Sequence, residues 1–274
     1  MAMHVLENEF LKVAVADAGA ELSSVVDKES GLERLHDANP DVWNRHAPIL
    51  FPFVGKVIGG VYRIGDKEYN MKTQHGFARD KEFECVAATQ YFVTHRLVST
   101  EATKEIYPFD FELLVTHSLD AENPRVLRID WEVKNTGNET MFYSIGGHPG
   151  FMIPEGEKKE DYYIEFPGRD DLKYVTVNLD TGFIAADKEY KLETENGFIK
   201  YEDTIPDTWI FDFQNIETVR IARPDKTPAI TMNCGQFPLL AVWANPEGTF
   251  ICLEPWFGRS DNDGFTCTID EKVA

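Results

Sequence analysis

Cysteine is scarce in this 274-residue chain, and the four cysteines present follow no metal-binding or redox pattern. They are Cys85, Cys234, Cys252 and Cys267, with no CxxC pair and no histidine at zinc-site spacing. Each lies among apolar or strand-like residues, which favours reduced structural thiols and a cytoplasmic location. Disulfide pairing is the less favoured alternative.

Long apolar runs and basic residues are also in short supply. No segment approaches the roughly 18 apolar residues that a membrane-spanning helix needs. The opening MAMHVLENEFLKV has neither the basic region nor the cleavable apolar stretch of a secretion signal. The chain has 27 Lys and Arg against 47 Asp and Glu, a formal charge of −20. Such a charge repels phosphates, so neither nucleic acid nor a membrane is expected as a partner.

Helical periodicity is rare, and short strand patterns replace it. Apolar residues alternate with polar ones, and β-branched and aromatic residues are frequent, in FLKVAVA, GVYRI, KEYNM, FDFELLVTHSL, VLRIDWEVKN and LLAVWA. Gly65 and Asp66 separate two of these segments as a tight hairpin would. No linker, repeat or composition shift divides the chain. We therefore predict a single domain over 1–274 with an all-β fold, a large antiparallel β-sandwich.

Several catalytic and metal motifs are missing. The sequence has no HxxxH, no HxH, no nucleophile elbow GxSxG and no phosphate-cradling glycine loop. No metal site is predicted, although ligands remote from one another in sequence stay open. Four histidines without an accompanying pattern are interpreted as structural: His4, His36, His95 and His117.

The segment GGHPGF places His148 between a Gly-Gly and a Pro-Gly pair. Glycines permit unusual backbone angles and close approach of a ligand, and proline stiffens the turn. An imidazole there can donate or accept a proton near neutral pH. The alternative is a turn histidine bonded to a neighbouring carbonyl, and this motif alone does not decide between the two.

Two further segments pair a histidine with an arginine. In QHGFARD, His75 and Arg79 suit hydrogen bonding to sugar hydroxyls or to an anion, while a surface ion pair of Arg79 is the plainer interpretation. In WNRHAPILFPFVGKV, the apolar part reads as core, and Arg45 and His46 stand at its start.

The segment CLEPWFGRSD sets Glu254 between apolar residues and directly before an aromatic pair. It follows PLLAVWANPEGTFI, two apolar strands joined by a turn, so Glu254 should lie in or near a buried strand. Carboxylates are seldom buried without a partner or a function.

The segments RHAPILFPFVG, QHGFARD, GGHPGF and CLEPWFGRSD occur in this order over residues 45–261. Together they resemble the aldose 1-epimerase (mutarotase) superfamily, in particular its bacterial LacX-like branch. The resemblance implies a supersandwich fold and a reaction without metal or cofactor. That reaction interconverts the α and β anomers of a small sugar or sugar phosphate.

The resemblance also implies roles for individual residues. Glu254 matches the general base and His148 the general acid, and a partly apolar, aromatic setting would suit the base. The implied substrate-binding residues are His75, Arg79, Arg45 and Asp207, with Asp212 as the rival for the aspartate position, and Trp256 against the apolar face of the sugar.

The preferred sugar, its phosphorylation state and the oligomeric state are not predicted. The HGFAR form is similar to that of hexose-6-phosphate mutarotases, and Arg45, Arg79 and Lys56 would suit a phosphate. A non-catalytic sugar-binding or sensing domain on the same fold is the main alternative. A glycoside hydrolase would need a second carboxylate, such as Asp207 or Asp261, in a comparable motif.

Overall fold

The computed structural model describes residues 2–201 and 208–273, and strands make up most of its regular structure. Helical structure in this part of the chain is confined to α1 (Glu101–Lys104) and to single 3-10 turns at Ile58–Gly60, Ala78–Asp80, Lys159–Asp161 and Ile269–Glu271. None of the described helices has the length and apolar character to cross a bilayer. The fold is the predicted single-domain antiparallel β-sandwich, so the expected fold class is confirmed.

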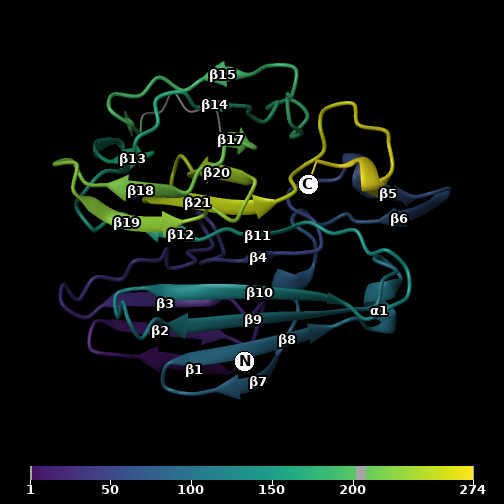
Figure 1. The fold of residues 1–274 in the computed structure, drawn as a ribbon, viewed down its shortest axis with the longest axis horizontal. Coiled ribbons are helices and arrows are strands. Elements are labelled where there is room, and N and C mark those ends of the chain that lie inside the picture. The colour runs from purple at the N-terminus through teal and green to yellow at the C-terminus, as the bar shows by residue number, and fades with distance from the viewer. Residues whose placement is uncertain (1, 202–207, 274) are drawn as a thin grey trace.

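Six strands form a central sheet in the order β17 (Thr208–Asp212), β20 (Leu239–Trp243), β21 (Phe250–Phe257), β11 (Ile145–Gly147) and β4 (Ile49–Leu50), with β12 (Gly150–Met152) also paired to β21. In Figure 1, seven strands lie below it: the sheet β1 (Met3–Glu7), β2 (Leu11–Ala16) and β3 (Leu22–Asp27), and the sheet β7 (Glu84–Ala88), β8 (Phe92–Val98), β9 (Phe111–Leu119) and β10 (Leu127–Asn135).

A four-stranded sheet and two short hairpins complete the described structure. The sheet contains β16 (Phe198–Lys200), β13 (Tyr163–Glu165), β18 (Thr218–Ala222) and β19 (Pro228–Asn233), and its strands β13, β18 and β19 lie at the left of Figure 1, beside β20 and β21 of the central sheet. The hairpins are β5 (Val61–Ile64) with β6 (Lys67–Asn70), and β14 (Lys173–Tyr174) with β15 (Tyr190–Lys191). The pair β5–β6 turns at Gly65, as its sequence predicts.

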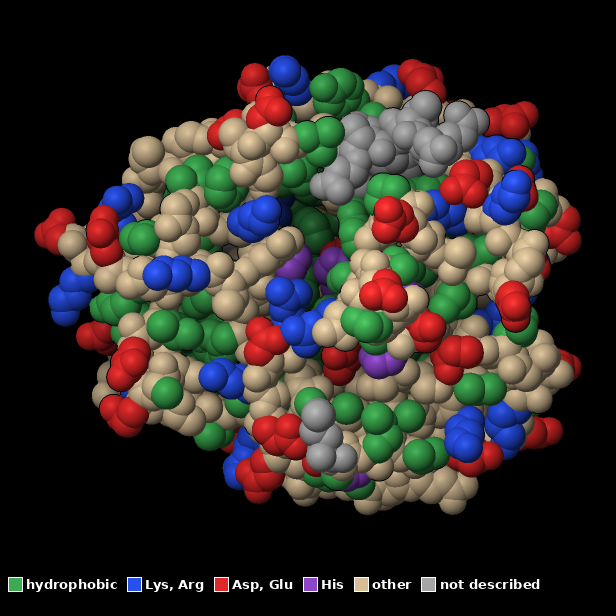
Figure 2. Space-filling model, turned by 180° about the vertical axis from the view of Figure 1, so that it is seen from behind, with side chains coloured by type: hydrophobic (Ala, Val, Ile, Leu, Met, Phe, Trp, Pro, Cys, Tyr) green, Lys and Arg blue, Asp and Glu red, His purple; other side chains and the backbone are tan. Residues whose placement is uncertain are grey.

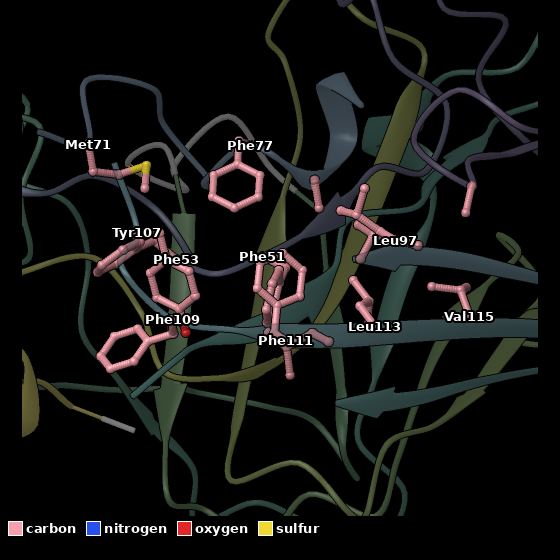
Figure 3. Packing of buried hydrophobic residues seen from close by; sticks show 14 of the residues in the cluster. Phe51, Phe53, Met71, Phe77, Leu97, Tyr107, Phe109, Phe111, Leu113 and Val115 are labelled. Carbon is pink, nitrogen blue, oxygen red and sulfur yellow. The ribbon is translucent and has the colours of Figure 1, made fainter. Parts of the chain in front are cut away.

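The packing of β9 follows from its sequence, FELLVTHSL. Buried and half-buried residues alternate along the whole strand, which is the period-two pattern of a strand with one face in a core. Phe111, Leu113 and Val115 on that face pack against Phe51 and Phe53, which follow β4. The rings of Phe51 and Phe111 meet edge to face, and Figure 3 shows both side chains in the same cluster as Phe53. A second core lies between the central sheet and the sheet of β13 and β18.

Two further segments whose sequences favour a strand, TMFYSI and KYVTVNL, form one over only a small part of their length. Of TMFYSI, only the last residue enters β11; Ser144 donates its N–H to Pro52 O, and Phe142 O accepts the Tyr107 hydroxyl. Those backbone groups are satisfied outside a strand ladder. Of KYVTVNL, only Lys173–Tyr174 forms a strand.

Strand β21 lies inside the molecule with both faces covered. Seven of its eight residues, all except Phe257, are buried. Ile251 and Leu253 face the core shared with β13 and β18, while Cys252, Glu254 and Trp256 point to the opposite face. This placement brings one carboxylate to the middle of the central sheet.

Candidate active site

Glu254 lies in the middle of β21, opposite Ala241 of β20. Only 1% of the residue is exposed. Ala241 has the smallest side chain that keeps a Cβ, so the strand beside Glu254 leaves space above the sheet for the carboxylate. The sequence expectation of a glutamate in a buried strand is confirmed.

His148 lies between β11 and β12, the two short strands that pair with opposite ends of β21. Its Nε2 is 3.3 Å from Oε2 of Glu254. Gly146 allows this approach of the two strands, because a Cβ there would lie 2.4 Å from Cδ1 of Trp256. The glycines of GGHPGF therefore make room for aromatic side chains, and the loop delivers the imidazole to the carboxylate.

His75 is the second buried histidine of the site, and its ring meets that of His148 edge to face with the centroids 5.5 Å apart. It sits in a left-handed turn with φ of 66°, followed by Gly76, where a Cβ would strike Phe51 O at 2.2 Å. The Gly55 N–H donates to His75 Nδ1 at 3.0 Å. The neutral ring therefore carries its proton on Nε2, which lies 2.9 Å from the side-chain amide of Gln74, so the amide oxygen of Gln74 is the group that can accept this proton.

Cationic side chains stand beside the two histidines. Arg79 donates to Gln74 O at 2.7 Å, and Arg45 donates to Arg79 O at 3.2 Å and pairs with Asp80. Figure 2 shows a hollow near the centre of the view, with histidine side chains deep in it and Lys and Arg side chains along part of its rim. These arginines are local cations in a chain whose formal charge is −20.

Burial and these charges fix the protonation state of the histidines. Burial, with the added charge of Arg79, lowers the pKa of His148 to about 3. Burial, then His148, Arg79 and Lys56, holds the pKa of His75 well below its usual range. Both imidazoles are thus neutral at pH 7 in the sugar-free site.

Tryptophans line the wall beside His148. The ring of Trp43 lies 4.9 Å from that of His148, and Trp243 meets it edge to face at 5.5 Å. Both tryptophans are half-buried. Trp256 is more deeply placed, 6% exposed, in an apolar cluster with Leu239. The sequence patterns assigned Trp43 to the core and did not single out Trp243. The signals that could have marked them as site residues were the position of Trp43 directly before NRH and that of Trp243 directly before ANPEG.

The structure describes only one of the two aspartates that were candidates for binding the sugar. Asp207 lies outside the described residues. Asp212, at the end of β17, accepts two hydrogen bonds from Nε of Arg259 at 2.9 and 3.0 Å. Arg259 is 3% exposed and was not singled out from the sequence, although it stands inside CLEPWFGRSD. Asp261, a candidate second carboxylate for hydrolysis, is buried and pairs with Lys272.

A metal ion would find three potential donors at this site. Donor atoms of His148, Cys252 and Glu254 lie within 4.8 Å of one another. Burial, together with Glu254, raises the pKa of the Cys252 thiol well above its usual range. Metal binding would require that thiol to lose its proton, so this set fits proton transfer better than coordination.

Comparisons with known proteins identify the family of this chain. The family model for aldose 1-epimerase matches residues 3–232. The chromosomal LacX protein of Lactococcus lactis subsp. lactis is 32% identical over 265 residues, which cover 93% of this chain and 87% of LacX. Among solved structures, a galactose mutarotase related enzyme from Lactobacillus acidophilus is 30% identical and superposes with a TM-score of 0.88, covering 99% of this chain and 90% of that one.

A galactose mutarotase-like protein from Lactobacillus casei is 29% identical, with a TM-score of 0.90 over 99% of this chain and 93% of its own. The family model ends before β21, so the assignment of the family does not depend on Glu254. The match over most of the chain establishes that this protein belongs to the aldose 1-epimerase family.

Proposed function

We propose that this protein is a mutarotase that interconverts the α and β anomers of a hexose or a hexose 6-phosphate, with Glu254 as base and His148 as acid. The observation that carries the proposal is the separation of 3.3 Å between their functional atoms in a buried site. The hydroxyl oxygen that loses its proton and the ring oxygen that gains one are both bonded to the anomeric carbon. An acid and a base lying side by side can therefore serve both oxygens at once.

Both residues return to their starting protonation states after one full cycle. Glu254 takes the proton of the C1 hydroxyl while His148 supplies one to the ring oxygen, and the bond between C1 and that oxygen breaks. Rotation about the C1–C2 bond presents the other carbonyl face, and the two transfers then run in reverse. Because His148 is neutral in the sugar-free site, the cycle begins when its imidazole takes up a proton from solvent as the sugar binds. Glu254, as a carboxylate 3.3 Å away, would stabilise that imidazolium, and the lowered pKa makes the imidazolium a ready donor.

Other side chains would hold the sugar against this pair. His75 Nε2 lies 2.9 Å from the side-chain amide of Gln74, and a sugar oxygen would have to replace or share this contact to accept from His75. The half-buried rings of Trp43 and Trp243 offer apolar surface to the pyranose ring. The Arg79 guanidinium supports binding of an anionic group, since its Nε makes no hydrogen bond within the described part of the chain. Contact of Trp256 and Asp207 with the sugar, and a cytoplasmic location, stay predictions.

The test is anomer exchange at C1, followed by NMR against the spontaneous rate. Glucose, galactose and their 6-phosphates are compared in parallel. Acceleration of any of them supports the proposal, and the pattern separates free sugars from phosphates. Measurable binding without acceleration of any of the four would favour the alternative of a non-catalytic sugar-binding domain.

A further inference from the structure

Three residues that are far apart in the sequence converge outside the active site. His4 lies on β1, Asp17 directly follows β2, and His95 lies on β8 of the neighbouring sheet. His4 Nε2 is 2.8 Å and His95 Nε2 is 3.1 Å from the same oxygen, Oδ1 of Asp17. The two imidazole rings stand nearly perpendicular, with their centroids 5.2 Å apart.

We propose that His4, Asp17 and His95 form a binding site for a divalent transition-metal ion, with zinc as the expected occupant. Two imidazole nitrogens and one carboxylate oxygen are the donor set of many three-ligand zinc sites, in which water completes the tetrahedron. Donor atoms around zinc are about 3.3 Å apart when the bonds are 2.0–2.1 Å long. The two nitrogen–oxygen pairs seen here would have to widen by only a few tenths of an ångström, and all three donor atoms lie within 4.8 Å of one another.

The protonation states suit coordination, which needs an ionised carboxylate and neutral imidazoles. Burial lowers the pKa of His95. The pKa of Asp17 is also lowered, because hydrogen bonds from His4 and His95 outweigh its partial burial. The cluster can be reached from solvent, since the side chains of His4 and Asp17 are 23% and 17% exposed while that of His95 is fully buried.

Cys85 offers a further donor, on β7 directly opposite His95. Its Sγ lies 4.0 Å from Nδ1 of His4, on the side of the ring away from Asp17. Burial, and then Asp17, raises the pKa of the thiol. A neutral thiol is a poor ligand, so the fourth position belongs to water.

An ion at this site would tie the β1–β3 sheet to the β7–β10 sheet. Zinc that binds the folded chain and not the unfolded one raises the melting temperature by mass action. At a hundredfold excess over Kd, the expected rise for a domain of this size is roughly 5–10 °C.

The experiment uses tag-free, full-length protein that has been dialysed against EDTA and then titrated with zinc chloride. Calorimetry should give one tight site per chain, and melting should shift upward with zinc. His4→Gln and Asp17→Asn should each weaken zinc binding at least tenfold and remove the shift. Melting curves in EDTA verify that both variants are folded.

His148→Asn is the control for the other donor cluster of the chain. It should bind zinc as the wild type does, and zinc should not inhibit anomer exchange. Three results would overturn the proposal: no zinc bound by the wild type, unchanged binding in both His4→Gln and Asp17→Asn, or loss of binding in His148→Asn. None of these readouts requires the protein to be a mutarotase.

Discussion

His117 gives the protein a pH-dependent stability that can be calculated from its position. The residue lies on β9, 1% exposed, diagonal to His95 on the inner face of the sheet. Burial, with the nearby His95, lowers its pKa to about 3. In the unfolded chain the same imidazole titrates near its ordinary pKa of about 6.5.

The free energy of unfolding should fall as the pH falls, because the unfolded chain binds a proton that the folded chain does not. Between pH 6.5 and 3 the unfolded chain holds a proton on this ring that the folded chain does not, so stability is lost as pH falls through that window. Each pKa unit corresponds to about 1.36 kcal/mol. From pH 7 to pH 5, the free energy of unfolding should therefore fall by about 2 kcal/mol through His117 alone.

The test is urea unfolding of the wild type and of His117→Leu at pH 7, 6 and 5. Leucine keeps an apolar side chain at the site and cannot titrate. The wild type should lose about 2 kcal/mol more than the variant between pH 7 and pH 5. Parallel pH dependences would refute the reasoning, since the other titrating groups are common to both proteins.

Three further substitutions have defined outcomes. Lys272→Met leaves a buried aspartate unpaired and should lower the free energy of unfolding in urea by about 3–5 kcal/mol. Gly146→Ala forces a Cβ against Trp256 and should lower the free energy of unfolding by about 1–3 kcal/mol. In the control Gly137→Ala, the new Cβ would meet its neighbours at 3.5 Å, which is an ordinary contact. This control should lose less than about 1 kcal/mol, as an ordinary surface substitution does. Arg79→Met should raise KM for a hexose 6-phosphate by at least about tenfold and that for the free hexose much less; equal increases would show that Arg79 binds hydroxyls.

The strands were predictable wherever one face is buried and the other is not. Segments such as FELLVTHSL carry the period-two pattern in full, and β9 forms as expected. The pattern is weaker in TMFYSI, whose backbone bonds to Pro52 and Tyr107 in place of a strand ladder. Those partners are remote in sequence, so no local rule reveals them.

The motifs marked the segments that form the site but not the contacts within it. Glycine, proline and histidine together flagged the loop of His148, and a lone glutamate between apolar residues flagged β21. The ion pair of Asp212 with Arg259 joins residues 47 positions apart. His4 and His95 were interpreted as separate structural histidines, because only the packing of two sheets brings them together with Asp17.

The central claim is that Glu254 and His148 act as one acid–base pair. The direct measurement is the C1 exchange rate, by NMR, of Glu254→Gln and His148→Asn on the best substrate of the wild type. Glu247→Gln, which changes an exposed glutamate in the turn before β21, is the matched control. We expect each active-site variant to lose about 10²- to 10⁴-fold in rate while still binding the sugar, and the control to match the wild type. Exchange at the wild-type rate in either variant would contradict the account.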